Sequence, residues 1–176
     1  TAYTPDQPEI AQGRLEALIN FQTAICDLTG MEIANASLLD EATAAAEAVT
    51  LAHAVSSVAD GNLVLIDADT HPQTIDVLKT RAEPLDITLV IAPVAELLKR
   101  AASPASGERP FALLISNPGS SGAARSIRAD VEAAHAVKLL VIVATDPLAA
   151  VLMESAGAQG ADVVIGSSHR FGVPMG

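Results

Sequence analysis

Short apolar runs alternate along this chain with stretches that carry apolar residues at helical spacing. This alternation predicts an α/β fold with a parallel or mixed sheet and helices on both faces. The runs lack the alternation of a strand that faces water on one side, so they are typical of buried parallel strands. The stretches between them carry apolar residues at helical spacing. Half of the 176 residues are hydrophobic, so the chain can bury a sizeable core, and its length suits one domain over residues 1–176.

Two helices are predicted to open the chain. Apolar residues at helical spacing predict a helix over Pro8–Thr29, and Gly30 is suited to end it in the left-handed conformation. Asp40 can cap a second helix, Glu41–Val58. This second helix is rich in alanine, which lets another backbone approach closely, so we expect it to be central and buried.

Strands and helices are then predicted to alternate along the rest of the chain. The predicted strands are Asn62–Asp67, Ile87–Ile91, Phe111–Ser116, Leu139–Thr145 and Ala161–Ile165, and the predicted helices are Pro72–Arg81, Val94–Ala102, Ser126–Val137 and Pro147–Ala156. In parallel α/β sheets, ligands bind at the carboxyl ends of the strands. Polar residues gather there, at Asp67–His71, Ser116–Gly122, Thr145–Asp146 and Gly166–Arg170.

The charge balance limits the partners and the compartment. A net charge of -11 argues against nucleic acid and against anionic membranes, whose phosphates need Lys and Arg partners. Cys26 stands alone, so no intrachain disulfide can form and a reducing compartment is expected. No signal-peptide pattern and no apolar run of about 18 residues occurs, which predicts a soluble cytosolic protein. The start at Thr1 and the loop-like end suggest a piece of a longer polypeptide.

Common cofactor and metal motifs are missing. No strand is followed by GxGxxG, and neither a GxxxxGK[ST] loop nor a GxSxG elbow is present. The histidines are too scattered to form a set of metal ligands, and helix caps or solvated faces explain the small acidic cluster. These residues are His71, His135 and His169, and Asp67, Asp69 and Asp76. We therefore expect no metal site.

Four long segments resemble one family. Tyr3–Ala48, Asp69–Leu85, Val143–Ala149 and Gly160–Gly176 resemble the amino-terminal half of glycine dehydrogenase (decarboxylating), the P-protein of the glycine cleavage system. The resemblance implies the large domain of a fold-type-I transferase that depends on pyridoxal phosphate, with a seven-stranded mixed sheet. It also implies that the cofactor-binding lysine lies in the carboxy-terminal half, or β subunit, and that this chain is part of the other half.

The resemblance also implies a reaction and partners. The parent enzyme releases carbon dioxide from glycine and passes the aminomethyl group to the lipoyl arm of a carrier, the H-protein. This chain would then be inactive alone and bind no pyridoxal phosphate itself, acting with the carboxy-terminal half or β subunit in an oligomer. Its location would be cytoplasmic in a bacterium and mitochondrial in a eukaryote.

Two residues match positions that contact the cofactor ring in the active half of the family. Asp146 matches the aspartate that pairs with the pyridinium nitrogen, although it could simply cap the helix that begins at Pro147. His71 matches the histidine that stacks on the ring, although it could be a loop histidine bonded to its neighbours. Both alternatives stay open on the sequence.

The place of the cofactor phosphate is acidic in this chain. The active half offers glycine and small polar residues at the start of the second helix, where this chain has Asp40 and Glu41. Carboxylates there satisfy the helix dipole themselves and repel a phosphate, by about 1 kcal/mol at 4 Å even in bulk water. Thr43 could donate one hydroxyl, which does not offset that repulsion.

The lysine of the active half has no counterpart here. His169 and Arg170 stand where that half has its His-Lys pair, and neither side chain can form an imine, because Arg stays protonated and imidazole is not a primary amine. Lys79, Lys99 and Lys138 are predicted to lie on solvated helix faces. We therefore interpret this half as a vestigial cofactor site.

Two further segments and three functions remain open. Ala2–Gly13, with Tyr3, could reach across an interface or be a plain arm, and it has Asp6 where the family usually has an aromatic residue. The turn Asn117–Gly122 could bind an anion or simply connect two elements. The chain could be part of the enzyme, an inert scaffold or assembly fragment, or, less favoured, an independent α/β binding protein.

Overall fold

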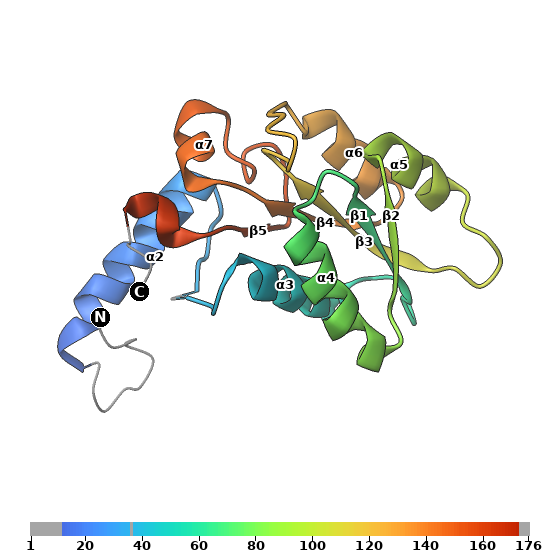
Figure 1. Cartoon of the computed structure of the whole chain (residues 1–176), viewed down its shortest axis with the longest axis horizontal. Helices are drawn as coiled ribbons and strands as arrows, with labels where there is room; N and C mark the ends of the chain where they lie inside the picture. The colour runs from blue at the N-terminus through green and yellow to red at the C-terminus, as the bar shows by residue number, and fades with distance from the viewer. Residues whose placement is uncertain (1–11, 36, 173–176) are drawn as a thin grey trace.

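The computed structural model describes residues 12–35 and 37–172 (Figure 1). Five strands, all parallel, form one sheet in the order β2-β1-β3-β4-β5. They are β1 (Leu63–Asp67), β2 (Thr88–Ala92), β3 (Pro110–Ser116), β4 (Leu140–Ala144) and β5 (Val163–Ile165). The predicted α/β class with a parallel sheet is confirmed. The seven-stranded mixed sheet that the resemblance implied stays a prediction.

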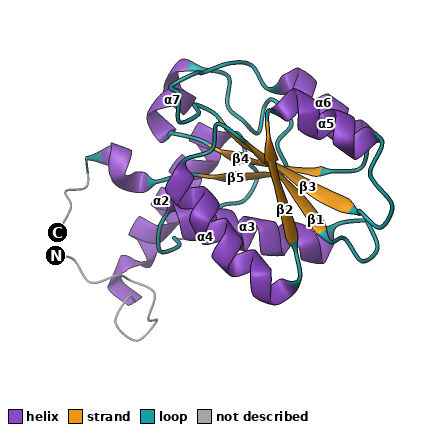
Figure 2. Cartoon of the chain, turned by 45° about the vertical axis from the view of Figure 1, so that its right-hand side comes forward, coloured by secondary structure: helices purple, strands orange, loops and turns teal. Residues whose placement is uncertain are grey.

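Within the residues that the structure describes, six α-helices and three short 3-10 helices connect and flank the strands. Figure 2 shows how the helices surround the sheet. The α-helices are α2 (Leu15–Thr29), α3 (Glu41–Val55), α4 (Pro72–Ala82), α5 (Val94–Ala102), α6 (Arg128–Ala136) and α7 (Pro147–Leu152). The 3-10 helices are η1 (Gln12–Arg14), η2 (Glu83–Leu85) and η3 (Ser168–Phe171). None of these described helices is long and apolar enough to cross a membrane.

Two apolar layers cover the two faces of the sheet. On one face α3 and α4 pack against alternate strand residues such as Val64 and Leu114. On the other face α5 and α6 pack against their neighbours, such as Leu65 and Leu113. Strand β3 is buried at all seven positions, because it lies in the middle of the sheet with a helix layer on each side.

The alanine-rich helix α3 is central, as predicted. Ala45 and Ala52 are fully buried and face the sheet, where their small side chains let the helix approach closely. The helix ends at Val55 and not at Val58, because Ser56 leaves the helical conformation and its hydroxyl accepts a hydrogen bond from the Val58 amide.

Helices α4, α6 and α7 also differ from their predicted bounds, and α4 ends one residue later than predicted, at Ala82. The predicted start of the first helix at Pro8 lies outside the described residues, which begin with η1 at Gln12. Helix α6 begins at Arg128 and not at Ser126, because the Ile127 amide bonds to the Gln159 side chain. Helix α7 ends at Leu152, well before the predicted Ala156.

Candidate functional site

The loops at the carboxyl ends of the strands lie beside the start of α3. The sheet order places β1 next to β3, and the chain runs from β1 to β2 in one direction and from β3 to β5 in the other. This reversal is the position at which parallel α/β sheets usually bind ligands. His71, Asp146 and Arg170 lie in the segments that follow β1, β4 and β5. They therefore lie at the side of the sheet formed by the carboxyl ends of its strands, which we call the edge.

Asp146 is the N-cap of α7, and both of its carboxylate oxygens are engaged. Its Oδ1 accepts a hydrogen bond from the Leu148 amide at 2.9 Å. Its Oδ2 accepts one from Arg170 Nε, also at 2.9 Å. The capping role that the sequence left open is therefore present, and a cationic partner comes with it.

Glu41 lies close enough to Asp146 and His71 to feel their charges. Burial is the main cause that raises the pKa of the Glu41 carboxyl, and the charge of Asp146 adds to the rise. A charge on His71 acts in the opposite direction and lowers that pKa. The fold thus brings the predicted ring-stacking histidine and the predicted ring-pairing aspartate near the same half-buried glutamate at the start of α3.

His71 occupies the N-cap position of α4 without capping it. Its side chain makes no capping hydrogen bond, and its carbonyl oxygen accepts from the Ile75 amide. The residue is half-buried. The side chain is therefore not committed to the start of α4, and its role toward a ring stays a prediction.

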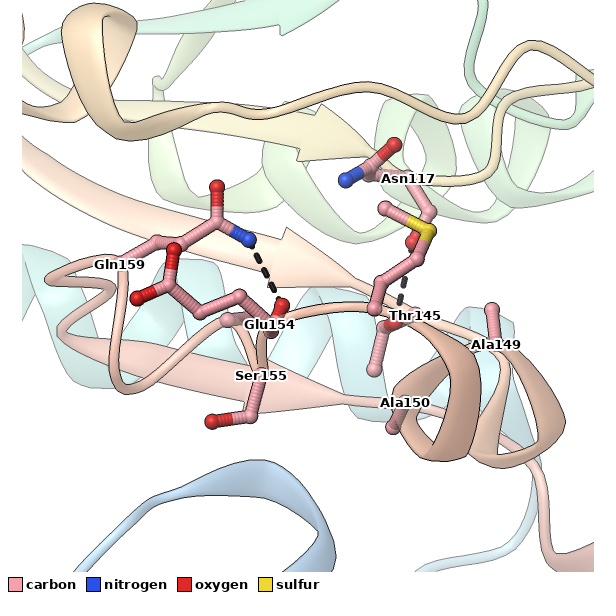
Figure 3. A pocket seen from close by; sticks show the side chains of 9 residues that line it. Asn117, Thr145, Ala149, Ala150, Glu154, Ser155 and Gln159 are labelled. Carbon is pink, nitrogen blue, oxygen red and sulfur yellow. Dashed lines mark hydrogen bonds between the residues drawn. The ribbon is translucent and has the colours of Figure 1, made fainter.

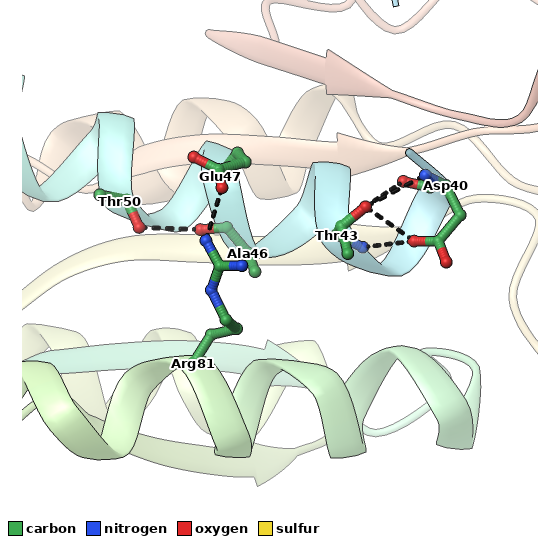
Figure 4. Close-up of polar contacts among 6 residues, drawn as sticks. All are labelled: Asp40, Thr43, Ala46, Glu47, Thr50 and Arg81. Atoms are coloured by element: carbon green, nitrogen blue, oxygen red, sulfur yellow. Dashed lines mark hydrogen bonds and ion pairs between the residues drawn. The ribbon is translucent and has the colours of Figure 1, made fainter. Parts of the chain in front are cut away.

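The start of α3 is closed by a reciprocal capping box (Figure 4). The Thr43 amide donates to Asp40 Oδ1 at 2.8 Å, and the Asp40 amide donates to the Thr43 hydroxyl oxygen at 3.1 Å. These bonds from Thr43 hold the pKa of the Asp40 carboxyl below its usual value. The Thr43 hydroxyl, which we considered for a cofactor phosphate, also bonds back to Asp40.

The lysines lie away from this edge. Lys79 is exposed on α4 and pairs with Asp76, and Lys99 is exposed on α5. The prediction that Lys138 lies on a helix face is wrong, because α6 ends at Ala136 and Lys138 adopts a left-handed turn (φ 64°) before β4. That turn precedes the amino end of β4, opposite the candidate site. His169 lies exposed in η3, beside Arg170.

The turn Asn117–Gly122 is occupied by an internal carboxylate. Asp69 accepts hydrogen bonds from the Ser121 amide at 2.8 Å and from the Ser121 hydroxyl at 2.7 Å. These two bonds hold the pKa of Asp69 below its usual value. The close approach of Asp69 requires glycine at position 119, since a Cβ there would lie 1.9 Å from Asp69 Oδ2. Asp69 thus takes the donors that an external anion would need.

A second carboxylate lies buried at the end of β1. Asp67 is 7% exposed, and burial is the main cause that raises its pKa. Its Oδ1 accepts a hydrogen bond from the Asp69 amide at 3.1 Å. This hydrogen bond holds the backbone of the loop between β1 and His71, so the buried Asp67 side chain has a structural role there.

A small pocket lies beneath α7 (Figure 3). Its polar lining is bonded internally. Gln159, which is 3% exposed, donates to the Glu154 carbonyl and accepts from the Ile127 amide, and the Thr145 hydroxyl donates to the Asn117 carbonyl. These bonds give the pocket a packing role. Within residues 12–35 and 37–172, His, Cys, Asp and Glu side chains form no group suited to a metal.

The comparison with protein families gives one match. The sequence model described as glycine cleavage system P-protein matches residues 1–176, which is the whole chain. The chain belongs to the P-protein family. The family assignment made from the sequence is therefore confirmed.

Curated P-protein relatives are much longer than this chain. Glycine dehydrogenase (decarboxylating) of Cereibacter sphaeroides is 54% identical over 176 residues, and the chain covers 18% of it. The protein of the same name from Thermosynechococcus vestitus is 55% identical over 177 residues, again with 18% of its length covered. The chain thus spans about a fifth of these P-proteins.

Solved structures agree with the family and the fold. A crystal structure titled glycine decarboxylase (P-protein) of the glycine cleavage system, in inhibitor-bound form, matches all of this chain with a TM-score of 0.83 and 37% identity, over 39% of that chain. Cystathionine gamma lyase from Micromonospora echinospora matches 94% of this chain with a TM-score of 0.64 at 19% identity, over 43% of its own length, which shows the fold alone. The P-protein chain therefore has the fold of pyridoxal-phosphate-dependent transferases.

The residues at the edge do not fit pyridoxal phosphate. The described part of the chain brings no lysine to it, and the Asp146 oxygens are already bonded. Two carboxylates, Asp40 and Glu41, stand at the start of α3, where a phosphate would need donors. The long-range bonds of Asp146 and of Asp69 were missed by sequence reasoning, because their partners lie far away along the chain.

Proposed function

We propose that this chain is a segment of a glycine dehydrogenase (decarboxylating), in the half that lacks the cofactor-binding lysine. It supports glycine decarboxylation and aminomethyl transfer to the lipoyl carrier H-protein without binding pyridoxal phosphate itself. The observation that carries the proposal is the family match over all 176 residues. The absence of lysine from the described edge of the sheet supports the assignment to the non-lysine half.

The support acts through assembly with the rest of the enzyme. Helices α2 and α7 contact each other, and large apolar side chains of these helices and of the segment between α2 and α3 are exposed. Exposed apolar patches mark interfaces. We call this surface the apolar end and define it by Leu15, Ile19, Ile33, Leu39, Leu148, Val151 and Leu152. Its partner in the proposal is the carboxy-terminal half or β subunit, in the bacterial cytoplasm, since the matched relatives quoted above are bacterial.

A chimaera tests this proposal. The matching segment of the Cereibacter sphaeroides enzyme is replaced by this chain, and carbon dioxide release from glycine is measured with lipoylated carrier protein. We expect activity, because the segment is 54% identical over its whole length. A matched chimaera with Leu97→Asp should be inactive, because Leu97 is fully buried and a charge there prevents folding.

The contrary result is equally clear. A chimaera that folds, binds pyridoxal phosphate in its lysine half and yet releases no carbon dioxide would contradict the proposal. It would leave this chain as an inert scaffold of the same fold.

A further inference from the structure

The contact between Arg170 and Asp146 joins two segments that the family resemblance matches to the cofactor site of the lysine half. Arg170 lies in η3, in the segment that corresponds to the lysine loop, and Asp146 lies at the start of α7, at the position of the ring-pairing aspartate. Arg170 Nε lies 2.9 Å from Asp146 Oδ2. The side chains are 61% and 24% exposed, respectively, so the pair lies at the rim of the edge.

The chemistry of this contact matches that of a protonated ring nitrogen. A pyridinium presents one N–H donor with a positive charge to a carboxylate, and a guanidinium Nε–H presents the same combination. A guanidinium cannot form an imine, and it keeps its charge at every physiological pH. The second oxygen of Asp146 already accepts a hydrogen bond from the Leu148 amide.

We infer that Arg170 is a built-in replacement for the cofactor ring: its guanidinium takes the acceptor on Asp146 and ties residues 167–172 to the start of α7. The inference deepens the proposed function and rests on it for the assignment of the two segments. The loop has internal bonds as well. The His169 amide donates to the Ser167 hydroxyl oxygen at 3.3 Å, and the Gly172 amide donates to the His169 carbonyl at 3.1 Å.

Amide hydrogen exchange of residues 168–172 tests the tie in the intact chain. Arg170→Ala removes the cation, and Asp146→Asn removes the charge but keeps an oxygen that can accept from the Leu148 amide. We expect each variant to speed exchange in the loop by about two- to fivefold, the factor of a partly exposed ion pair. The double variant should exchange no faster than either single variant, because both remove one interaction.

Arg81→Ala is the matched control. This variant also removes an ion pair between an arginine and a carboxylate, here Arg81 with Glu47, but that pair joins α3 to α4 on the outside of the fold (Figure 4). Loop exchange should stay at the wild-type rate in this variant. Unchanged exchange in Arg170→Ala, or effects of the two single variants that multiply in the double variant, would overturn the inference.

Cofactor uptake gives a second, independent readout. The wild-type chain is dialysed against pyridoxal phosphate, and a matching sample is reduced with borohydride and mapped by peptide mass. We expect neither stoichiometric binding nor a specific adduct on Lys79, Lys99 or Lys138. Binding of one cofactor per chain that Asp146→Asn abolishes would show that Asp146 is available to a ring, and would overturn the replacement by Arg170.

The two proposals fail separately. An inactive chimaera beside a loop that responds as expected contradicts the proposed function and leaves the ion pair with its structural role. An active chimaera beside an unresponsive loop contradicts the role of Arg170 and leaves the proposed function intact.

Discussion

Aspartates in the loops at the carboxyl ends of the strands and at the start of α3 accept hydrogen bonds from backbone amides. Asp40 accepts from the Thr43 amide, Asp69 from the Ser121 amide and Asp146 from the Leu148 amide. Amides at helix starts and in turns are the donors with which proteins bind phosphate groups. Here the protein's own carboxylates accept from these amides, which are therefore not free to bind an external anion.

The Asp40 cap is expected to stabilise the start of α3. Asp40→Ala should lower the free energy of unfolding by about 1 kcal/mol at pH 7, because the start of α3 loses its cap. Asp40→Asn should cost only a few tenths of that, because an asparagine oxygen still accepts from the Thr43 amide. Urea unfolding followed by circular dichroism measures both differences. Equal midpoints for Asp40→Ala and the wild type would show that the capping box does not stabilise α3.

The lowered pKa of Asp40 predicts how the difference in unfolding free energy between the wild type and Asp40→Asn depends on pH. The folded state favours the charged carboxylate, so its contribution to stability is present above the ordinary pKa of 3.8 and is lost as the pH falls through the lower, folded value. The difference in stability between wild type and Asp40→Asn should therefore shrink below pH 3.8. A difference that grows on acidification would contradict the assigned cause.

Helix α2 is attached to the rest of the fold by few contacts. It has no buried residue, and Leu15 and Ile19 are more than half exposed. Its end lies against the segment after α7, where the Gly157 amide donates to the Thr29 carbonyl at 2.8 Å. A Cβ on Gly157 would lie 2.4 Å from the Gly30 carbonyl oxygen, so glycine allows the two backbones to touch.

Gly157→Ala should therefore weaken the attachment of α2 to the rest of the fold. The new methyl group meets backbone atoms that cannot rotate away, and overpacking of this kind costs about 1–3 kcal/mol. Because α2 is packed on the surface, we expect its amides to exchange faster while the sheet keeps its protection. Gly13→Ala is the control, since a Cβ there meets nothing within 4 Å. Wild-type exchange rates in α2 would contradict this attachment.

The whole molecule has a well-packed sheet and one apolar end. The five strands bury both of their faces, whereas Leu39 and Leu152 of the apolar end are more than four-fifths exposed. In Figure 1 helices α2 and α7 lie side by side at this end, away from α5 and α6. The chain is also about a fifth of the length of its P-protein relatives. Such a surface favours contact with further protein.

Association at the scale of the molecule can be measured directly. We expect the chain to self-associate at micromolar concentration, and Leu152→Glu to weaken that association, because a charge replaces an exposed apolar side chain. Leu51→Glu is the control, since Leu51 is half exposed on α3 outside the apolar end. Sedimentation velocity separates the species. A monomeric wild type at all concentrations would contradict a role of this surface in self-association.

The sequence alone determined the class of fold, the order of its elements and the family. Apolar runs and helical spacing depend on residues that are close along the chain, so β1, α3 and α4 were predicted to within a few residues at their ends. The cap positions of Asp40 and Asp146 belong to the same local rules. The segment Ala2–Gly13, with Tyr3, lies largely outside the described residues, and its reach across an interface stays a prediction.

Only the tertiary structure decided what the edge of the sheet contains. Asp69 and Ser121 are 52 positions apart and Arg170 and Asp146 are 24 apart, and no local pattern pairs them. Their contacts exist because parallel strands bring loops from distant parts of the chain to a common edge in the order β2-β1-β3-β4-β5. The physical reason is one of range: hydrophobic period and helix capping act between near neighbours, whereas ion pairs across loops depend on which strands lie side by side.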